Sequence, residues 1–460
     1  MPVIPAIPTQ AEPNLATFVI ISNGEQLSEE IGLNLIHVIK TINKVPRAKI
    51  ELFDGDLSTE DFPLSAEDTF APGSEIEIKA GYRSNEDTIF KGIVIKHGIE
   101  AKTDEGLKLI VELRDPCIKM TVGRKNRYFE ETSDSDIIDE MLNDYGLESD
   151  VEQTEVTHAE MVQYFCTDWD FMLSRADANG KLVFADDGSI TVKAPVLDSD
   201  PVLTLQFGHN VKEFEAGMDA RTQYASATGK TWNFVQQEIS VIEGSDPGLD
   251  GQGNISGSQL ADVIGLESWA LQHNGLTPDQ ELQAWADAQM LRSRMAKIRG
   301  RITTIGYSEI KPGDVIELGG FGDRFNGTAY VSSVFQELMP DNKWQTHIEI
   351  GLDPQWFSKT YDDILETPAS GLVPAISGLH QGIVTSAHDD PEGEGRIKVR
   401  IPVISSEDQG VWARLATLDA GLGDGDDPSG TFFIPEIGDE VVVGFFNDDP
   451  RDPVILGMMH

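Results

Sequence analysis

The chain has 460 residues, 40% hydrophobic and 25% charged, a composition typical of a globular protein with room for roughly three domains. Its 78 acidic and 35 basic residues give a formal net charge of −43, which would repel phosphate backbones and argues against nucleic-acid binding. No apolar run is long enough to cross a bilayer, and residues 1–14 lack the basic flank and apolar region of a secretory signal. We therefore expect a protein that folds in the cytoplasm, or one exported without a signal peptide.

Strand patterns dominate the first third of the chain. Segment 74–80, SEIEIKA, alternates apolar and charged residues, which predicts a strand with one face in water. Segments 89–98 and 107–115 show the same pattern. Short strands separated by Gly, Pro, Asn and Asp are typical of barrels and sandwiches.

Two short helices are predicted by their end signals. The first covers 135–146 and ends at Gly146, a residue suited to the left-handed conformation that closes a helix. The second covers 167–179, where Thr167 can cap the positive end and Gly180 ends the helix.

A longer helix is predicted from Thr277 onward. Thr277 and Gln280 have the spacing of a capping box, Pro278 stands at the first helical position, and Gly300 is the expected end. Before this helix, segment 243–259 is rich in Gly, Ser and Asp, and we expect it to be mobile. After it, a linker-like stretch predicts a division of the chain near residue 372.

The most informative pattern is an internal repeat that begins at Pro72 and again at Pro312. Each copy has a Pro-Gly turn, an alternating strand with acidic residues, a loop, a glycine (Gly92 or Gly327) near an aromatic residue, and a second strand. Two β-hairpins could share this pattern by chance. The alternative is that the chain contains two related barrels.

Catalytic and metal-binding motifs are absent from the sequence. It has no HExxH, GxSxG or GxxxxGK[ST] motif, so we expect no enzyme activity, no metal and no cofactor. The acidic segments 419–430 and 250–256 resemble calcium loops in composition, but one has Gly430 in place of the last acidic ligand and the other has Ile255 in place of the glycine. Both are interpreted as solvated loops.

The remaining reactive or aromatic residues have structural interpretations. Cys117 and Cys166 are expected to be buried thiols, because two cysteines without CxxC spacing make no disulfide framework. The acid pairs at 389–390 and 448–449 are expected in turns, since neighbours on a strand point to opposite faces. Core packing is expected for three tryptophans, namely Trp169, Trp285 and Trp412.

Several segments together resemble the VgrG-like spike and hub proteins of contractile injection systems. The strongest likeness lies in HQGIVTSAHDDPEGEGRIKVRIP (380–402), GVWARLATLDAGLG (410–423) and FIPEIGDEVVVGFFNDDPRDPVILG (433–457), in the order of the OB-fold of that family. Segments 89–98, 124–147 and 163–195 resemble its hub domain, and 311–334 resembles its second barrel.

The resemblance implies a mainly β fold with α+β insertions. It divides the chain into a first hub β-barrel with an N-terminal extension (1–115), an α/β hub region (116–195), a second hub β-barrel with a long helix and a mobile loop (196–370), and a C-terminal OB-fold barrel (371–460). The resemblance implies structural roles for the residues that carry the family motifs. These residues are Gly92, Trp169, Asn179, Gly180, Gly327, Trp412, Pro435, Gly438, Asp439, Glu440, Asp449, Pro453 and Gly457.

The resemblance also implies a homotrimer that joins a hexameric inner tube and the baseplate to a membrane-piercing tip. The implied partners are the inner-tube ring, baseplate components, effector cargo, and a PAAR-type tip protein bound through a β-helical needle. Such a needle would begin at the last residues of the chain, and we interpret the stop at His460 as a needle that was removed, lost or left out. A tail-like particle released outside the cell is favoured over an envelope-anchored type VI apparatus.

Two other functions remain open at this stage. One is a β-protein that binds oligosaccharides or other polymers, as OB-folds often do. The other is an enzyme whose site forms at a trimer interface. Neither accounts for the internal repeat.

Overall fold

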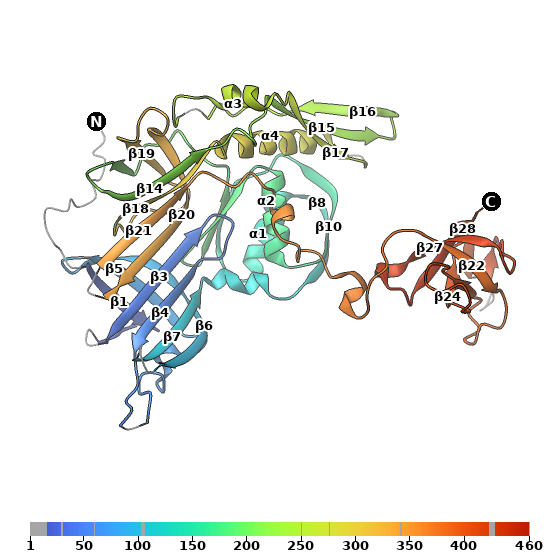
Figure 1. Ribbon diagram of the computed structural model, residues 1–460, viewed down its shortest axis with the longest axis horizontal. Coiled ribbons are helices and arrows are strands. Elements are labelled where there is room, and N and C mark those ends of the chain that lie inside the picture. The colour runs from blue at the N-terminus through green and yellow to red at the C-terminus, as the bar shows by residue number, and fades with distance from the viewer. Residues whose placement is uncertain are drawn as a thin grey trace. The chain divides into compact units, whose positions relative to one another are not determined.

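The computed structural model describes residues 16–28, 31–58, 60–102, 106–249, 251–275, 277–340, 343–422 and 428–459. The chain divides into two compact units, Met1–Ile364 and Leu365–His460 (Figure 1). The predicted N-terminal extension, Asp250, residues 423–427 of the acidic loop, and His460 lie outside the described residues. The finer division of the first unit at residues 115 and 195 stays a prediction.

Thirteen strands of the first unit form one sheet. They are β1 (Ala16–Ser22), β2 (Glu25–Gln26), β3 (Leu33–Thr41), β4 (Arg47–Phe53), β5 (Glu75–Tyr82), β6 (Asn85–Lys102), β7 (Gly106–Arg114), β13 (Leu203–Gln206), β14 (Val211–Met218), β18 (Ile298–Ile305), β19 (Val315–Gly319), β20 (Gly327–Met339) and β21 (Lys343–Ile350). A short 3-10 helix, η1 (Asp68–Phe70), precedes β5.

The sheet contains the same six-stranded module twice. In the first module the strands lie in the order β3-β4-β7-β6-β5-β1, and in the second they lie in the order β14-β18-β21-β20-β19-β13. Numbered along the chain, both orders are the same, so the internal repeat predicted from Pro72 and Pro312 is confirmed at the level of topology. β3 pairs with β20, so the two modules are joined into one sheet (Figure 1).

The modules differ in the direction of their first strand. β1 runs antiparallel to β5, whereas β13 runs parallel to β19. The alternation predicted for 74–80 is confirmed, since Ile76, Ile78 and Ala80 are at most 1% exposed and face the first core.

A smaller α/β region follows the first module. It contains η2 (Pro116–Thr121), β8 (Lys125–Ser133), α1 (Asp134–Asp144), β9 (Glu148–Val151), β10 (Thr157–Cys166), α2 (Asp168–Ala178), β11 (Leu182–Asp186) and β12 (Ser189–Lys193). Both predicted short helices are confirmed, including the Thr167 cap, whose side chain accepts a hydrogen bond from Asp170 N. Gly146 and Gly180 follow them with φ of 66° and 65°.

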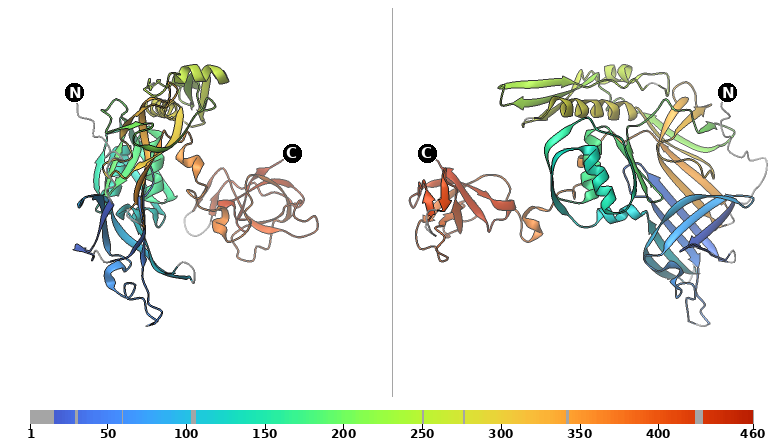
Figure 2. Two further views of the ribbon diagram at one scale, coloured as in Figure 1. Left: turned by 60° about the vertical axis from the view of Figure 1, so that its left-hand side comes forward. Right: turned by 180° about the vertical axis from the view of Figure 1, so that it is seen from behind.

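An insertion lies between β14 and β18, where the first module has only the short turn between β3 and β4. It contains β15 (Ser226–Asn233), β16 (Glu238–Glu243), α3 (Gly257–Ile264), β17 (Ser268–His273) and α4 (Asp279–Met295). The three strands form a ribbon that packs on α4 and extends past its end (Figures 1 and 2).

The predicted ends of the long helix are wrong. Pro278 is the N-cap of α4 and no side chain caps it, because Thr277 is held by the ribbon through a hydrogen bond from its N–H to Thr231 Oγ1. Gly300 lies in β18, beyond the helix end. A Cβ there would stand 2.4 Å from Glu215 O on β14, so the glycine allows two strands to approach.

Parts of segment 243–259, which was predicted to be mobile, form specific contacts. Asp246 forms an ion pair of 2.6 Å with Arg294, and Gln252 bridges to Gly327. The capping box of this region is made by Ser256 and Gln259 at the start of α3.

The second unit is a closed five-stranded barrel in the order β22-β23-β24-β28-β27, which confirms the predicted C-terminal barrel. Its strands are β22 (His380–Ser386), β23 (Ile397–Arg400), β24 (Val411–Leu415), β27 (Glu440–Phe445) and β28 (Pro453–Met458). The remaining elements are α5 (Phe357–Thr360) in the first unit, and η4 (Pro368–Gly371), β25 (Ala420–Leu422), β26 (Pro428–Gly430) and η5 (Phe446–Asp448) in the second.

A buried ionic cluster fixes the two helices of the α/β region. Asp134, 1% exposed at the start of α1, accepts hydrogen bonds from Arg175 Nε at 2.6 Å and from Asn179 Nδ2 at 2.8 Å. His158 Nε2 lies 3.1 Å from the same carboxylate, and Arg175 reaches Glu281 of α4 at 2.9 Å. Burial alone would raise the pKa of Asp134, but the hydrogen bonds and charge of Arg175 outweigh it and hold the pKa below its ordinary value.

The substitution Gly92→Ala should lower the free energy of unfolding by about 1–3 kcal/mol, because overpacking strains a closed core. A Cβ at this position would lie 2.4 Å from Arg114 O and 2.7 Å from the Phe90 ring. Gly98→Ala on the same strand is the control, since its Cβ would meet nothing closer than 4.0 Å. Denaturant unfolding in dilute solution measures both, and equal losses would contradict the packing argument.

Asp134→Asn should lower the free energy of unfolding at neutral pH by about 3 kcal/mol or more, because it leaves Arg175 buried without its main counter-charge. In the wild-type chain this contribution is complete above about pH 4, the pKa of an unfolded Asp, and disappears as the pH falls through the lower folded pKa. The variant should therefore show a flatter loss of stability below pH 4. Asp150→Asn, at an exposed position of β9, is the control and should leave the pH profile unchanged.

Candidate functional site

The two repeated hairpins begin with the same backbone turn. Gly73 and Gly313 follow the repeat prolines with φ of 101° and 96°, a region that favours glycine. Each turn exchanges two backbone hydrogen bonds with the second strand of its hairpin, at Val94 or Val331. The four bonds are Gly73 N to Val94 O (2.9 Å), Val94 N to Ser74 O (2.9 Å), Gly313 N to Val331 O (2.8 Å) and Val331 N to Asp314 O (2.9 Å).

The same turn occurs a third time in the C-terminal barrel, at Gly438 (φ 96°). Gly438 N donates to Val384 O at 2.9 Å, and Val384 N donates to Asp439 O at 3.0 Å. The carboxylate of Asp439 accepts from Glu436 N at 2.8 Å, just as that of Asp314 accepts from Lys311 N at 2.7 Å. The PEIGDE motif is therefore a turn that aligns β27 with β22.

The register distinguishes the two repeat glycines. Gly92 lies opposite Ile76, and the counterpart of that pair in the second module is Ile316 with Ala329. Gly327 stands two residues earlier, with φ of 114°, and a Cβ on it would lie 2.3 Å from Gly251 O. The absence of a side chain at Gly327 thus makes room for the backbone at Gly251, and Gly327 is not the counterpart of Gly92.

The other motif residues lie in two regions, at helix α2 and in the C-terminal barrel. Trp169 is buried in the core beneath α2, and Asn179 and Gly180 close that helix. In the barrel, Glu440 opens β27, Pro453 opens β28, and Gly457 pairs with Val442. Asp449 forms the turn between those strands, where hydrogen bonds from Arg451 lower its pKa to about 2.

The other two tryptophans expected in cores, Trp285 and Trp412, are only half-buried. Trp412 lies in β24, with the ammonium of Lys398 5.5 Å from its ring centre. This neighbour occupies one side of the ring. Trp285 of α4 is half-buried as well, so the expected core role is complete only for Trp169.

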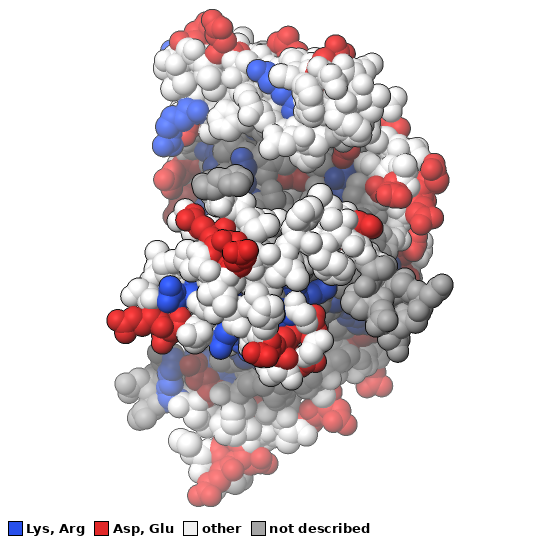
Figure 3. Space-filling model, turned by 90° about the vertical axis from the view of Figure 1, so that its right-hand side faces the viewer, with Lys and Arg blue, Asp and Glu red and all other residues white. Residues whose placement is uncertain are grey.

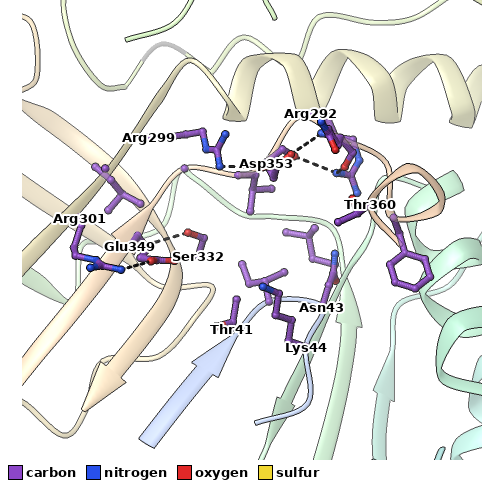
Figure 4. A pocket seen from close by; sticks show the side chains of 18 of the residues that line it. Thr41, Asn43, Lys44, Arg292, Arg299, Arg301, Ser332, Glu349, Asp353 and Thr360 are labelled. Atoms are coloured by element: carbon purple, nitrogen blue, oxygen red, sulfur yellow. Dashed lines mark hydrogen bonds and ion pairs between the residues drawn. The ribbon is translucent and has the colours of Figure 1, made fainter. Parts of the chain in front are cut away.

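A pocket of about 690 Å³ in the first unit lies beside β14, β18 and the end of α4 (Figure 4). It contains the side chains of Arg292, Arg299 and Arg301. Arg301 pairs with Glu349 at 3.1 Å and Arg299 pairs with Asp353 at 3.0 Å.

Arg292 is likewise engaged, through hydrogen bonds to the backbone oxygens of Asp353 and Gln355 and an ion pair with Asp177. Burial lowers the pKa of Arg292 to about 10, which leaves it charged at neutral pH. Because acidic or carbonyl oxygens already engage each of these guanidinium groups, the pocket does not favour an anionic ligand.

No catalytic or metal centre emerges from the described ranges. Within them, no three His, Cys, Asp or Glu side chains are grouped to hold a metal ion. Both cysteines are buried and unbridged, as predicted, and burial raises the pKa of Cys117, so it is a poor nucleophile. No helix in the same ranges combines the length and apolar character needed to span a membrane.

Exposed apolar side chains, which sequence patterns did not reveal, occur on several elements, among them the ribbon and the second unit. On the ribbon they are Trp232, Phe234, Val235, Ile239 and Val241, all at least 44% exposed. On the second unit they include Leu418, Phe432, Phe433, Ile434, Ile437, Leu456 and Met458, all at least 48% exposed. Exposed groups of this kind mark interaction surfaces. Charged side chains of both signs are spread over the face shown in Figure 3.

Solved structures share the fold. The tail protein from Neisseria meningitidis MC58 has a TM-score of 0.52 at 13% identity, and the 43 kDa tail protein of prophage MuSo2 from Shewanella oneidensis has 0.53 at 11% identity. Each comparison covers 74% of this chain and 98% of the other. The comparison with an E. coli component of the type VI secretion system covers 96% of this chain and 99% of the other at 13% identity. Its TM-score of 0.44 is too low to support a shared fold.

Two family models match the chain, whereas no curated protein does. Residues 380–460 match the type VI secretion system/phage-baseplate injector OB domain, which confirms the predicted resemblance to VgrG-like spikes. Residues 12–340 match the Alg8 N-terminal domain. Because this second match spans more than half of the chain, the protein belongs to the Alg8 N-terminal domain family, with an injector OB domain as its C-terminal unit.

Proposed function

We propose that this chain is the structural hub and spike subunit of a contractile injection system. The observation that carries the proposal is the six-stranded module present twice in one chain, followed by a single injector OB barrel. An enzyme or a polymer-binding module has no need of such a duplication.

The duplication suits an adapter between two symmetries. Three chains that assemble around one axis present six similar modules at the hub and three barrels at the spike. A hexameric inner tube would meet the modules, and a three-fold spike would continue from the barrels. The proposed partners are accordingly the inner-tube ring, baseplate components, effector cargo, and a PAAR-type tip protein reached through a needle.

The proposed action is mechanical and not catalytic. Several motif residues form turns and helix ends, and the pocket beside β14, β18 and the end of α4 contains arginines that are already engaged. Sheath contraction would supply the force, and the spike would transmit it. We favour a particle released outside the cell over an envelope-anchored type VI apparatus.

The exposed apolar side chains of the second unit support assembly into a trimer. Leu418 is 94% exposed and Phe433 is 64% exposed, so water contacts these side chains in the single chain. A stable interface that covers them must also overcome repulsion between chains of net charge −43. Burial at about 25 cal/mol per Å² does so only over a large interface, on the order of 2,000 Å² or more.

Association should strengthen as salt rises, because repulsion between acidic surfaces is screened over about 8 Å at physiological ionic strength. Sedimentation velocity of the full chain at low and moderate salt measures this, with trimers expected to gain at the expense of monomers. A chain that remains monomeric at every salt concentration would refute the proposed trimer. Dissociation on adding salt would refute the argument from charge.

Electron microscopy of the assembled chain tests the adapter itself. Class averages along the particle axis should show six similar densities in the hub ring and three-fold density at the spike. Three hub densities without an alternating second set would contradict the adapter role even if the trimer forms.

A further inference from the structure

The two modules are joined within one chain by the pairing of β3 with β20, which is called the joint below. β3 pairs antiparallel with the second half of β20, from Ser333 opposite Thr41 to Leu338 opposite Ile36. In the middle of this joint Val38 lies opposite Gln336, and these side chains are 1% and 3% exposed. The pairing thus buries side chains as well as backbone groups.

Matching irregularities give the residue equivalence of the two modules. The register of β6 with β7 shifts just after Val94, and that of β20 with β21 shifts just after Val331. The register of β3 with β4 shifts just after Leu33, and that of β14 with β18 just after Val211. By this equivalence Ile99 corresponds to Gln336, and Ala216 corresponds to Val38.

Each module therefore has one strand edge of the β3 type and one of the β20 type. Within one chain, the β3 edge of the first module pairs with the β20 edge of the second. The counterpart of β3 is β14, which ends the sheet. The counterpart of the second half of β20 is segment 96–101 of β6, which pairs with β7 on one side. On its other side no described strand pairs with it. Open sheet edges are templates for further strands.

We infer that β14 of one chain pairs antiparallel with residues 96–101 of β6 in a second copy of the chain, with Ala216 opposite Ile99. This inference rests on the proposed function and deepens it, since it names the contact that closes the hub ring. Each intermolecular joint repeats the intramolecular joint, so modules follow one another around the ring through the same strand pairing.

The exposure of Ile99 supports this partner. Ile99 is 53% exposed in the single chain, whereas its counterpart Gln336 is 3% exposed in the joint. Docking of β14 would cover Ile99 with Ala216. The transferred register also places Lys96 opposite Asp219, a pair of opposite charges.

One position of the register has like charges, Glu100 opposite Glu215. Both have a basic neighbour: Lys102 lies 2.9 Å from Glu100, and Arg301 lies opposite Glu215 on β18.

Disulfide trapping in the full chain tests the register. In the double variant Ile99→Cys/Ala216→Cys, opposed Cβ atoms would lie about 4.5–5.5 Å apart, close enough to bridge after small adjustment. Ile99→Cys/Met218→Cys is the register control, because Met218 is a diagonal neighbour about 7–8 Å away. The native cysteines are buried and do not compete.

Under mild oxidation the opposed pair should give covalent dimers and trimers on a non-reducing gel, several-fold more than the control pair or either single variant. A trimer by sedimentation that gives no such crosslinks, or gives them equally in the control, overturns the inference and leaves the proposed function standing. A chain that never associates overturns both.

A second measurement uses no cysteine. Ile99→Lys should weaken association of the full chain, because it places a charge in the middle of the joint. Leu57→Lys changes an 81% exposed side chain outside either edge and should leave association unchanged. Equal association of wild type and Ile99→Lys would overturn the inference, and circular dichroism of both variants shows that they are folded.

Discussion

The pairing of β3 with β20 is the contact on which the first unit depends. It joins residues nearly three hundred positions apart and makes one sheet from two modules. The core follows the sheet across the joint, because Leu338 and Trp344 of the second module belong to the core of the first. Tyr82 reinforces the connection, since its ring lies 5.3 Å from that of Trp344 and its hydroxyl donates to Gly306 O. The first module would not have a complete core alone.

Local signals in the sequence predicted local structure well. The Thr167 cap, the glycines after α1 and α2, and the alternating strand at 74–80 depend on neighbours within a few residues. The repeated turns were also detectable, because a Pro-Gly pair needs a particular backbone conformation. Of the motif residues, the glycines and aspartates of these turns have the structural role that their residue types suggest.

Contacts between distant segments left no such trace. No pattern near β3 indicates β20 as its partner, so the pairing that joins the two modules was not predicted. Thr277 has the spacing of a cap, but its backbone is held by Thr231 of another strand, a contact that spacing cannot reveal. The exposed apolar side chains of the ribbon were not predicted either. An alternating strand has the same sequence pattern whether its apolar face is covered by its own chain or by another.

The two modules share a topology that suits the proposed ring, and they also differ from each other in two features. β1 and β13 run in opposite directions relative to their neighbours, and only the second module carries the insertion with α4 and the ribbon. In the proposed ring the two kinds of module alternate, so the inner joints repeat six times while the outer features repeat three times. A six-fold tube can bind what the modules share, and a three-fold spike can follow what distinguishes them. In the proposed ring, duplication followed by divergence of the outer strands would give one chain both symmetries.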